Sequence, residues 1–279
     1  RRRQWNSWAG VVGCTTCHTK RDWNRFSGPI KTDAMGAGGE SFNLGAAGML
    51  YSKNITPAAL GNWSDGEVIR AVTQGVSKDG APLFPLMPYT HFGAMAEDDV
   101  HAVVAYIRTL KAIDGVPPAR QLNFPLNLIV RTIPGPNTYG KRPSPDDKVA
   151  YGKYIVQAAL CSDCHTPIDD RGTPVPGMDF AGGQEFVETG YHVRSANITP
   201  DANTGIGSWT EQQFIDKFKA FENPDAAPVL GEKEKHQNTV MPITAYAGMA
   251  REDLSAIFAY LRTLKPVTNR VEKFPDATP

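Results

Sequence analysis

Two short motifs of the same form contain every cysteine of the chain. The first, at residues 14–18, reads CTTCH, and the second, at residues 161–165, reads CSDCH. A Cys-x-x-Cys pair can serve as half of a zinc site, as a redox dithiol, or as the thioether anchor of a haem whose iron binds the adjacent histidine. The first question is which of these chemistries the two motifs perform.

The zinc alternative requires ligands from two motifs far apart in the sequence to converge, and the dithiol alternative leaves the companion histidine without a role. Haem attachment uses both cysteines and the histidine, because the two sulfurs add to the vinyl groups and the histidine lies under the iron. The motifs therefore predict two covalently bound haem c groups, each with its iron. The predicted thioether residues are Cys14, Cys17, Cys161 and Cys164, and the predicted iron ligands are His18 and His165.

Each half of the chain also has a methionine followed by proline, at Met87 and Met241. Both lie in proline-containing loops before a predicted helix, and a thioether sulfur is a suitable second axial ligand for low-spin iron. We predict that these two residues complete the iron coordination. Met95 and Met249 are predicted to pack in the core. The remaining histidines do not recur between the halves and are not predicted as ligands: His91, His101, His192 and His236.

Haem propionates need partners when they are buried. The indole N–H groups of Trp63 and Trp209 and the side-chain amides of Asn54 and Asn197 are candidate donors to them. The alternatives are that the tryptophans pack in the core and that the asparagines are turn residues. Both alternatives stay open on the sequence alone.

The chain is an internal repeat. The stretch SKNITP at 52–57 corresponds to SANITP at 195–200, and the stretch at 93–111 corresponds to that at 247–265. The motifs, the tryptophans and the Met-Pro pairs follow in the same order in both halves. We predict a first haem domain at 1–116, an ordered linker at 117–146 and a second haem domain at 147–279. Apolar linker residues are expected to be buried: Phe124, Leu126, Leu128, Ile129 and Val130.

Helical periodicity dominates the elements that position these residues. Val100, Val103, Val104 and Ile107 lie on one helical face, and the second half repeats the pattern at 254–264. Further helices are predicted to begin after Ser64, which forms a capping box with Glu67, and after Thr210. A helix leads into Cys161, and its Gly152 could permit a close crossing with the last helix. No convincing alternating strand is found, so an all-α fold is predicted.

Composition excludes several classes of protein. The 279 residues carry 29 basic and 29 acidic side chains, which gives no general attraction for nucleic acid. No run of 18 apolar residues is present, and the start lacks the apolar region of a signal peptide. We expect that any signal peptide has been removed or never existed, and a membrane anchor upstream of Arg1 stays open. The basic run Arg1–Arg3 is interpreted as a solvated terminus.

The motifs together resemble those of dihaem c-type cytochromes and of the haem domains in cytochrome c subunits of periplasmic alcohol, aldehyde and gluconate dehydrogenases. The resemblance implies two tandem class I cytochrome c domains with His/Met ligation that carry electrons. It also implies a periplasmic or extracytoplasmic location and redox partner proteins such as a dehydrogenase, an oxidase or a small carrier. Membrane association would come through a partner or an upstream anchor.

The sequence departs from the resemblance in the first half. The dehydrogenase subunits usually carry three haem motifs, whereas this chain carries two. Lys20 stands at the position that corresponds to Pro167 in the second half, so the hydrogen-bond partner of the His18 ring nitrogen is left open. The stretch before Cys14 has a weak helical pattern, with Trp5 at the position that corresponds to Gly152. Electron transfer without catalysis is the leading hypothesis. The alternatives are a dihaem peroxidase with one open haem, for which His91 is suggestive, and a haem-based gas sensor.

Overall fold

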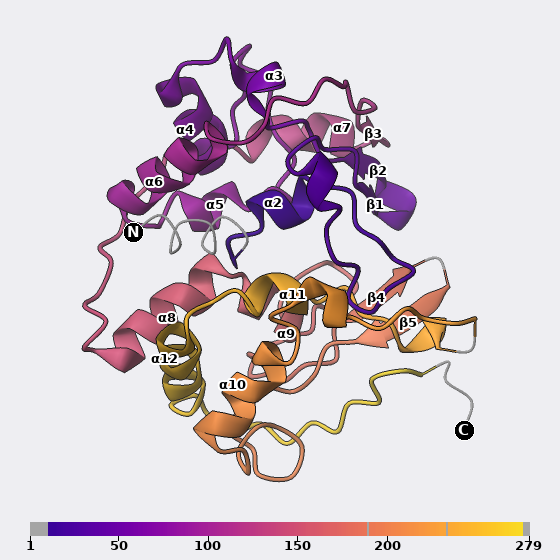
Figure 1. The fold of residues 1–279 in the computed structure, drawn as a ribbon, viewed down its shortest axis with the longest axis vertical. Helices are drawn as coiled ribbons and strands as arrows, with labels where there is room; N and C mark the ends of the chain where they lie inside the picture. Colours follow the sequence, from indigo (N-terminus) through magenta and orange to yellow (C-terminus); the bar gives the residue numbers. More distant parts are fainter. Residues whose placement is uncertain (1–10, 189, 233, 276–279) are drawn as a thin grey trace. The chain divides into compact units, whose positions relative to one another are not determined.

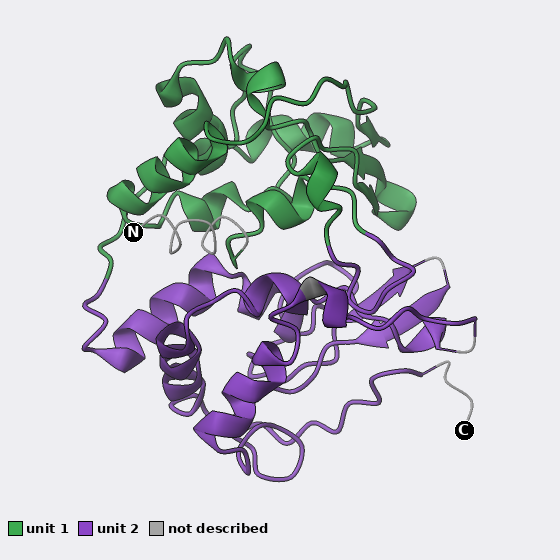
Figure 2. Cartoon of the chain, in the orientation of Figure 1, with its two compact units in different colours: residues 1–21, 30–142 green, residues 22–29, 143–279 purple. Residues whose placement is uncertain are grey.

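The computed structural model describes residues 11–188, 190–232 and 234–275. The chain forms two compact units, unit 1 from residues 1–21 and 30–142 and unit 2 from residues 22–29 and 143–279 (Figure 2). Most of the stretch predicted as a linker is part of unit 1, and the predicted haem-domain boundaries stay a prediction. Arg1–Arg3 and Trp5 lie outside the described residues.

Unit 1 combines short helices with a small antiparallel sheet of order β1-β2-β3 (Figure 1). Phe42 of β1 pairs with Leu50 of β2, and Met49 of β2 pairs with Gln121 of β3. The helices are α2 (Cys14–Cys17), α3 (Pro57–Leu60), α4 (Asp65–Gln74), α5 (Tyr89–Phe92), α6 (Glu97–Ile107) and α7 (Leu126–Ile129), and the strands are β1 (Ser41–Asn43), β2 (Gly48–Tyr51) and β3 (Gln121–Leu122). Short 3-10 turns lie at Thr32–Ala34, Gly45–Ala47 and Val130–Thr132.

Unit 2 repeats this order around a two-stranded hairpin, in which Phe186 of β4 pairs with Val193 of β5 (Figure 1). Its helices are α8 (Lys148–Ala158), α9 (Cys161–His165), α10 (Glu211–Lys219), α11 (Ile243–Tyr246) and α12 (Arg251–Leu261), and its strands are β4 (Glu185–Glu188) and β5 (Tyr191–Arg194). Short 3-10 turns lie at Pro224–Ala226 and Lys235–Gln237.

The prediction of an all-α fold of two tandem class I cytochrome c domains is wrong, because the described residues include five strands in two sheets. The strands are too short for their alternation to stand out. In β5 Tyr191 and Val193 are buried, and His192 and Arg194 are partly exposed. Gly48, with φ 115°, begins β2 in a backbone conformation that favours glycine.

The predicted helical faces are confirmed. Val100, Val103, Val104 and Ile107 are buried on α6, and Leu254, Ile257, Phe258 and Leu261 are buried on α12. Ser64 and Glu67 form the predicted capping box on α4. Thr210 and Gln213 form a second capping box on α10, which was not predicted from the sequence.

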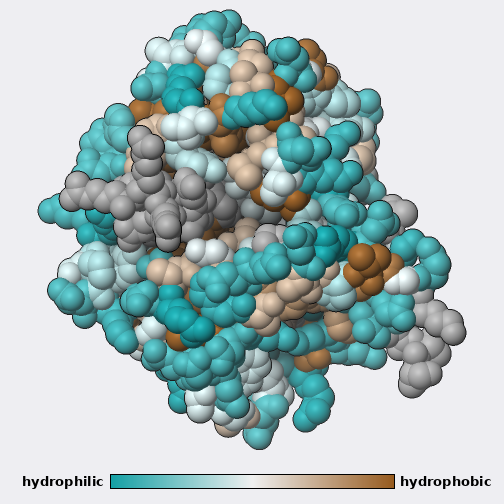
Figure 3. Space-filling model, in the orientation of Figure 1, coloured by the Kyte–Doolittle hydropathy of each residue, from teal (hydrophilic) through white to brown (hydrophobic). Residues whose placement is uncertain are grey.

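The expectation that the linker side chains are buried is wrong for most of them. Val130 is 1% exposed, whereas Phe124 is 79% exposed and Leu128 is 52% exposed. Hydrophobic groups elsewhere on the face drawn in Figure 3 are scattered among hydrophilic residues. Among the described residues, no helix has both the length and the apolar character needed to cross a bilayer.

Helices α8 and α12 cross closely at a glycine, as predicted. A Cβ atom added at Gly152 would lie 1.9 Å from the carbonyl oxygen of Ala256, so any side chain there would push the helices apart. The crossing is also fixed by a hydrogen bond from the Tyr151 hydroxyl to the Asp253 carboxyl group at 3.1 Å. Burial raises the pKa of that carboxyl group above its ordinary value.

The Gly152→Ala substitution is therefore expected to destabilise unit 2 by about 2 kcal/mol through overpacking. The free energy of unfolding, measured by circular dichroism in denaturant, checks this. Gly66→Ala is the matched control, because a Cβ added there meets nothing within 4 Å on α4. The control should stabilise unit 1 by about 0.5 kcal/mol. An unchanged stability of the Gly152 variant would contradict the close crossing.

Candidate haem sites

Each cysteine motif folds as one helical turn entered through a left-handed residue. Gly13 has φ 83° before α2, and Leu160 has φ 58° before α9. In the first motif the amide of His18 donates to the carbonyl of Cys14 at 2.9 Å. This turn explains the spacing, since it brings both cysteines and the histidine around one short segment.

The two histidine rings are held in the same way. The Nδ1 atom of His18 lies 2.7 Å from the carbonyl oxygen of Lys53, and that of His165 lies 2.7 Å from the carbonyl oxygen of Ala196. A carbonyl only accepts, so Nδ1 carries the proton and Nε2 keeps its lone pair. Burial lowers the pKa of both histidines below the ordinary value, which keeps the rings neutral. Neither Nε2 has a hydrogen-bond partner among the described residues.

The stretches that supply these carbonyls are bound to the motifs by matching backbone bonds. The amide of Gly38 donates to the carbonyl of His18 at 2.8 Å, and that of Gly182 donates to the carbonyl of His165 at 2.7 Å. A Cβ at Gly38 would lie 2.5 Å from the carbonyl carbon of Lys53. These glycines thus permit two chain segments to approach closely. His18 and His165 bind carbonyl groups at corresponding positions. The presence of Lys20 where the second half has Pro167 therefore does not change the hydrogen-bond partner of the histidine ring.

The predicted asparagines have partners within the protein. In unit 1 the side-chain Oδ1 of Asn54 accepts hydrogen bonds from the backbone amide and the hydroxyl of Thr56. The side-chain Nδ2 of Asn54 donates to the backbone carbonyl of Ile113 at 2.8 Å. The corresponding bonds of unit 2 join Asn197, Thr199 and Val267. Asn54 and Asn197 are each 5% exposed. They tie the stretch that supplies the carbonyl group to the segment after α6 in unit 1 and to the segment after α12 in unit 2.

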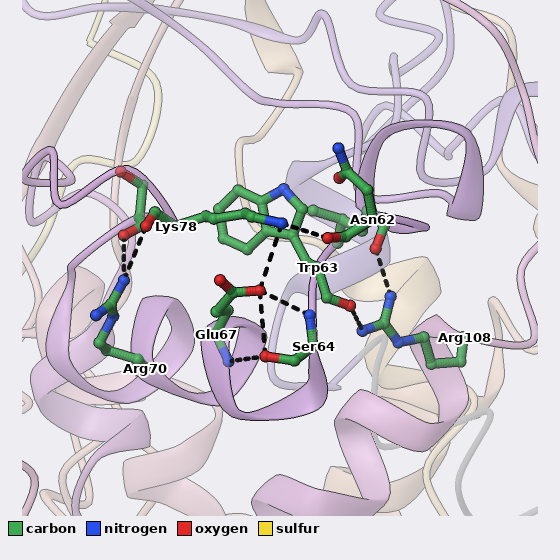
Figure 4. A network of polar contacts seen from close by, with 9 residues as sticks. Asn62, Trp63, Ser64, Glu67, Arg70, Lys78 and Arg108 are labelled. Carbon is green, nitrogen blue, oxygen red and sulfur yellow. Dashed lines mark hydrogen bonds and ion pairs between the residues drawn. The ribbon is translucent and has the colours of Figure 1, made fainter.

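The loop of each predicted tryptophan is bonded by an arginine that follows α6 or α12, and Figure 4 shows this for Trp63 and Arg108. Arg108 donates to the carbonyls of Leu60 and Trp63, each at 2.6 Å. Arg262 makes the corresponding bond to the carbonyl of Gly207. Both indole rings are half-buried, and among the described residues their N–H groups have no hydrogen-bond partner. The sequence analysis did not single out these arginines, although both occur in the repeated RTLK stretch.

The Met-Pro pairs form the same turn in both units. Pro88 has φ −82° and ψ 55°, and Pro242 has φ −80° and ψ 61°, which are values of an inverse γ-turn. The amide of the residue after each proline donates to the methionine carbonyl, at 2.7 Å from Tyr89 to Met87 and at 2.8 Å from Ile243 to Met241. These two methionines are partly exposed, whereas the methionines predicted as core, Met95 and Met249, are 4% and 3% exposed.

The donor set fits haem better than zinc or a dithiol. Burial raises the pKa of Cys14 and that of Cys161 to about 12. A raised thiol pKa disfavours dithiol exchange, which requires a thiolate. Among the described residues, no three of the His, Cys, Asp and Glu side chains cluster as a metal site. A thiol pair beside a neutral imidazole with an available Nε2 suits thioether attachment and iron ligation.

Comparison with known proteins agrees with this chemistry. Residues 149–265 match the model of the cytochrome c family. The chain is 30% identical to the fructose dehydrogenase cytochrome subunit of Gluconobacter japonicus, over 91% of this chain and 50% of that protein. It is 29% identical to the cytochrome c subunit of a quinone alcohol dehydrogenase from Gluconacetobacter polyoxogenes, over 93% and 55%. The chain thus spans about half the length of these relatives.

A shorter relative is similar over most of its own length. The chain is 25% identical to a diheme cytochrome c-type protein of Cereibacter sphaeroides, over 93% of this chain and 84% of that protein. The predicted resemblance to dihaem cytochromes and dehydrogenase cytochrome subunits is confirmed by these similarities.

The asparagine network yields a stability prediction. Asn197→Ala removes the donor to Val267 and leaves the buried amide of Thr199 without its acceptor, so a loss of about 2 kcal/mol is expected. Denaturant unfolding followed by circular dichroism checks this. Asn203→Ala is the control, because that side chain is exposed, and it should change stability by less than about 0.5 kcal/mol. Equal effects of the two substitutions would refute the role of Asn197.

Proposed function

Because the chain contains a cytochrome c region at residues 149–265, we propose that it is an electron-transfer protein with two covalently bound haem c groups, one for each motif. The observation that carries the proposal is the repeated bond from histidine Nδ1 to a backbone carbonyl, at 2.7 Å in both units. The haem iron supplies one-electron transfer when bound. The protein's contribution is to hold and orient the iron ligands and to exclude other chemistry.

His18 and His165 are proposed as the proximal iron ligands through Nε2. A hydrogen bond from Nδ1–H fixes the tautomer and the ring orientation and makes Nε2 a stronger donor. The carbonyl partners, on Lys53 and Ala196, come from rigidly bonded loops. The ligand therefore needs little rearrangement when the iron changes charge.

Met87 and Met241 are proposed as the second axial ligands. Each side chain projects from a proline γ-turn, which limits the freedom of the loop that bears it. Their partial exposure contrasts with the buried Met95 and Met249, which have no open side for a further contact. Ligation by His and Met leaves the iron without a vacant position, which favours electron transfer over peroxide turnover or gas sensing.

For the propionates we propose Trp63 and Trp209 as donors. Their indole N–H groups have no partner in the described part of the chain, whereas the amides of Asn54 and Asn197 already donate to backbone carbonyls. A haem carboxylate placed beside each indole would satisfy both groups.

We also propose a dehydrogenase as electron donor and a bacterial periplasmic or extracytoplasmic location. Support for the donor comes from relatives that are named as cytochrome subunits of fructose and alcohol dehydrogenases. Thioether haem attachment in bacteria occurs outside the cytoplasm, which supports the location.

Potentiometric titration followed by visible spectroscopy tests this function. The expected result is low-spin c-type spectra, two haems per chain and two one-electron steps. The steps should differ in potential, because the surroundings of the first motif depart from those of the second. A single haem, or a high-spin ferrous spectrum with rapid peroxide turnover, would contradict the proposal.

Methionine variants test the ligation. Met87→Ala and Met241→Ala should each convert one haem to a form that binds carbon monoxide readily, and each should lower the potential of that haem. Met95→Leu and Met249→Leu are matched controls that keep the core apolar, and both should leave the visible spectra unchanged. Carbon monoxide binding and near-infrared spectra of the ferric state provide the readout. Unchanged ligation in the alanine variants would exclude these ligands.

A further inference from the structure

A stretch that follows the first cysteine motif in the sequence belongs to unit 2, which contains the second motif. Residues 22–29, with the sequence DWNRFSGP, fall in unit 2, although the residues on both sides, 1–21 and 30–142, form unit 1 (Figure 2). We call this stretch the 22–29 segment. The second half has no comparable excursion in its own sequence, since 143–279 lies wholly in unit 2.

Ser27 of this segment contacts the backbone of the loop that bears Met241. Its hydroxyl donates to the carbonyl of Met241 at 2.6 Å and accepts from the amide of Ile243 at 3.1 Å. Ser27 is 0% exposed and has φ 62°, a conformation that residues other than glycine seldom adopt. The surrounding structure thus holds a serine in an unfavourable backbone conformation with its hydroxyl on the Met-Pro turn.

Asn238 fastens the same two segments from the other side. Its Oδ1 accepts from the amides of Ser27 and Thr239, both at 2.8 Å, and its Nδ2 donates to the carbonyl of Trp23 at 3.2 Å. The side chain is 1% exposed. One buried amide therefore joins the 22–29 segment to the start of the Met241 loop.

The rest of the segment is anchored to a neighbouring part of unit 2. Arg25 donates through Nε to the carbonyl of Ala227 at 3.0 Å, and the amide of Phe26 donates to the carbonyl of Pro228 at 2.9 Å. The rings of Phe26 and Phe221 stack with centroids 5.6 Å apart. These contacts make the segment a fixed support rather than a passing loop.

Met87 of unit 1 has no such support in the described structure. Its amide donates to the carbonyl of Phe84 at 3.0 Å, and its carbonyl accepts from the amide of Tyr89 at 2.7 Å. Both partners are backbone groups of its own loop. The two Met-Pro turns thus share their geometry but differ in what restrains them.

We propose that Ser27 is a positioning residue for Met241, through which the 22–29 segment holds the methionine loop of the second site closed. The proposal rests on the proposed function, because it takes Met241 to be an iron ligand. Oγ makes one bond on each side of Pro242 and so resists the opening of the γ-turn. Removal of this hydroxyl should make exchange of the methionine for an external ligand easier at the second haem and leave the first haem unaffected.

Carbon monoxide binding to the ferrous protein tests this in Ser27→Ala and Ser27→Gly. The glycine variant removes the hydroxyl while it relieves the positive φ, so it remains informative if the alanine variant folds poorly. Both should raise carbon monoxide affinity at one haem by about tenfold, which corresponds to about 1.4 kcal/mol, the order of one buried hydrogen bond. In a Met87→Ala background, the altered haem should be the one that still has its methionine.

Asn24→Ala is the matched control, because its side chain is exposed in the same segment and makes no hydrogen bond among the described residues. It should leave both haems unchanged. If the wild type shows Met ligation at both haems and the Ser27 variants bind carbon monoxide as the wild type does, the positioning role is wrong and the proposed function stands. An equal effect of Asn24→Ala would also overturn the role of Ser27. Absence of Met ligation in the wild type would instead overturn the proposed function.

Discussion

The hydrogen bond from a histidine Nδ1 to a loop carbonyl is the interaction around which each unit is organised. The carbonyl of Lys53 or Ala196 can occupy its place only because Gly38 or Gly182 lets the two segments approach. The same loop is tied by its asparagine to the segment after α6 in unit 1 and after α12 in unit 2. The orienting bond is thus accompanied in both halves by a glycine, an Asn-Thr turn and a segment that follows a long helix.

The halves differ where a side chain restrains the methionine. Met241 is held by Ser27, whereas Met87 depends on backbone bonds within its own loop. Two sites with the same proposed ligands would therefore differ in how readily a ligand is exchanged. If both motifs bind haem as proposed, the more restrained site is expected to be limited to electron transfer.

The residues of the candidate sites could be proposed from the sequence because they lie in short motifs that recur in both halves. The helical faces of α6 and α12 and the crossing at Gly152 also followed from periodicity and a missing side chain. The strands were missed because stretches of three or four residues, such as Ser41–Asn43, give too little alternation. The contact between Ser27 and Met241 could not be predicted, because the two residues lie 214 positions apart in the sequence and no pattern links them.

The central claim, that each motif carries one covalently bound haem, is tested most directly by mass spectrometry of proteolytic peptides from the holoprotein. Two peptides are expected to carry the additional mass of one haem each, one that contains Cys14 and Cys17 and one that contains Cys161 and Cys164. Haem on only one of these peptides, or free or disulfide-bonded cysteines in either, would contradict it.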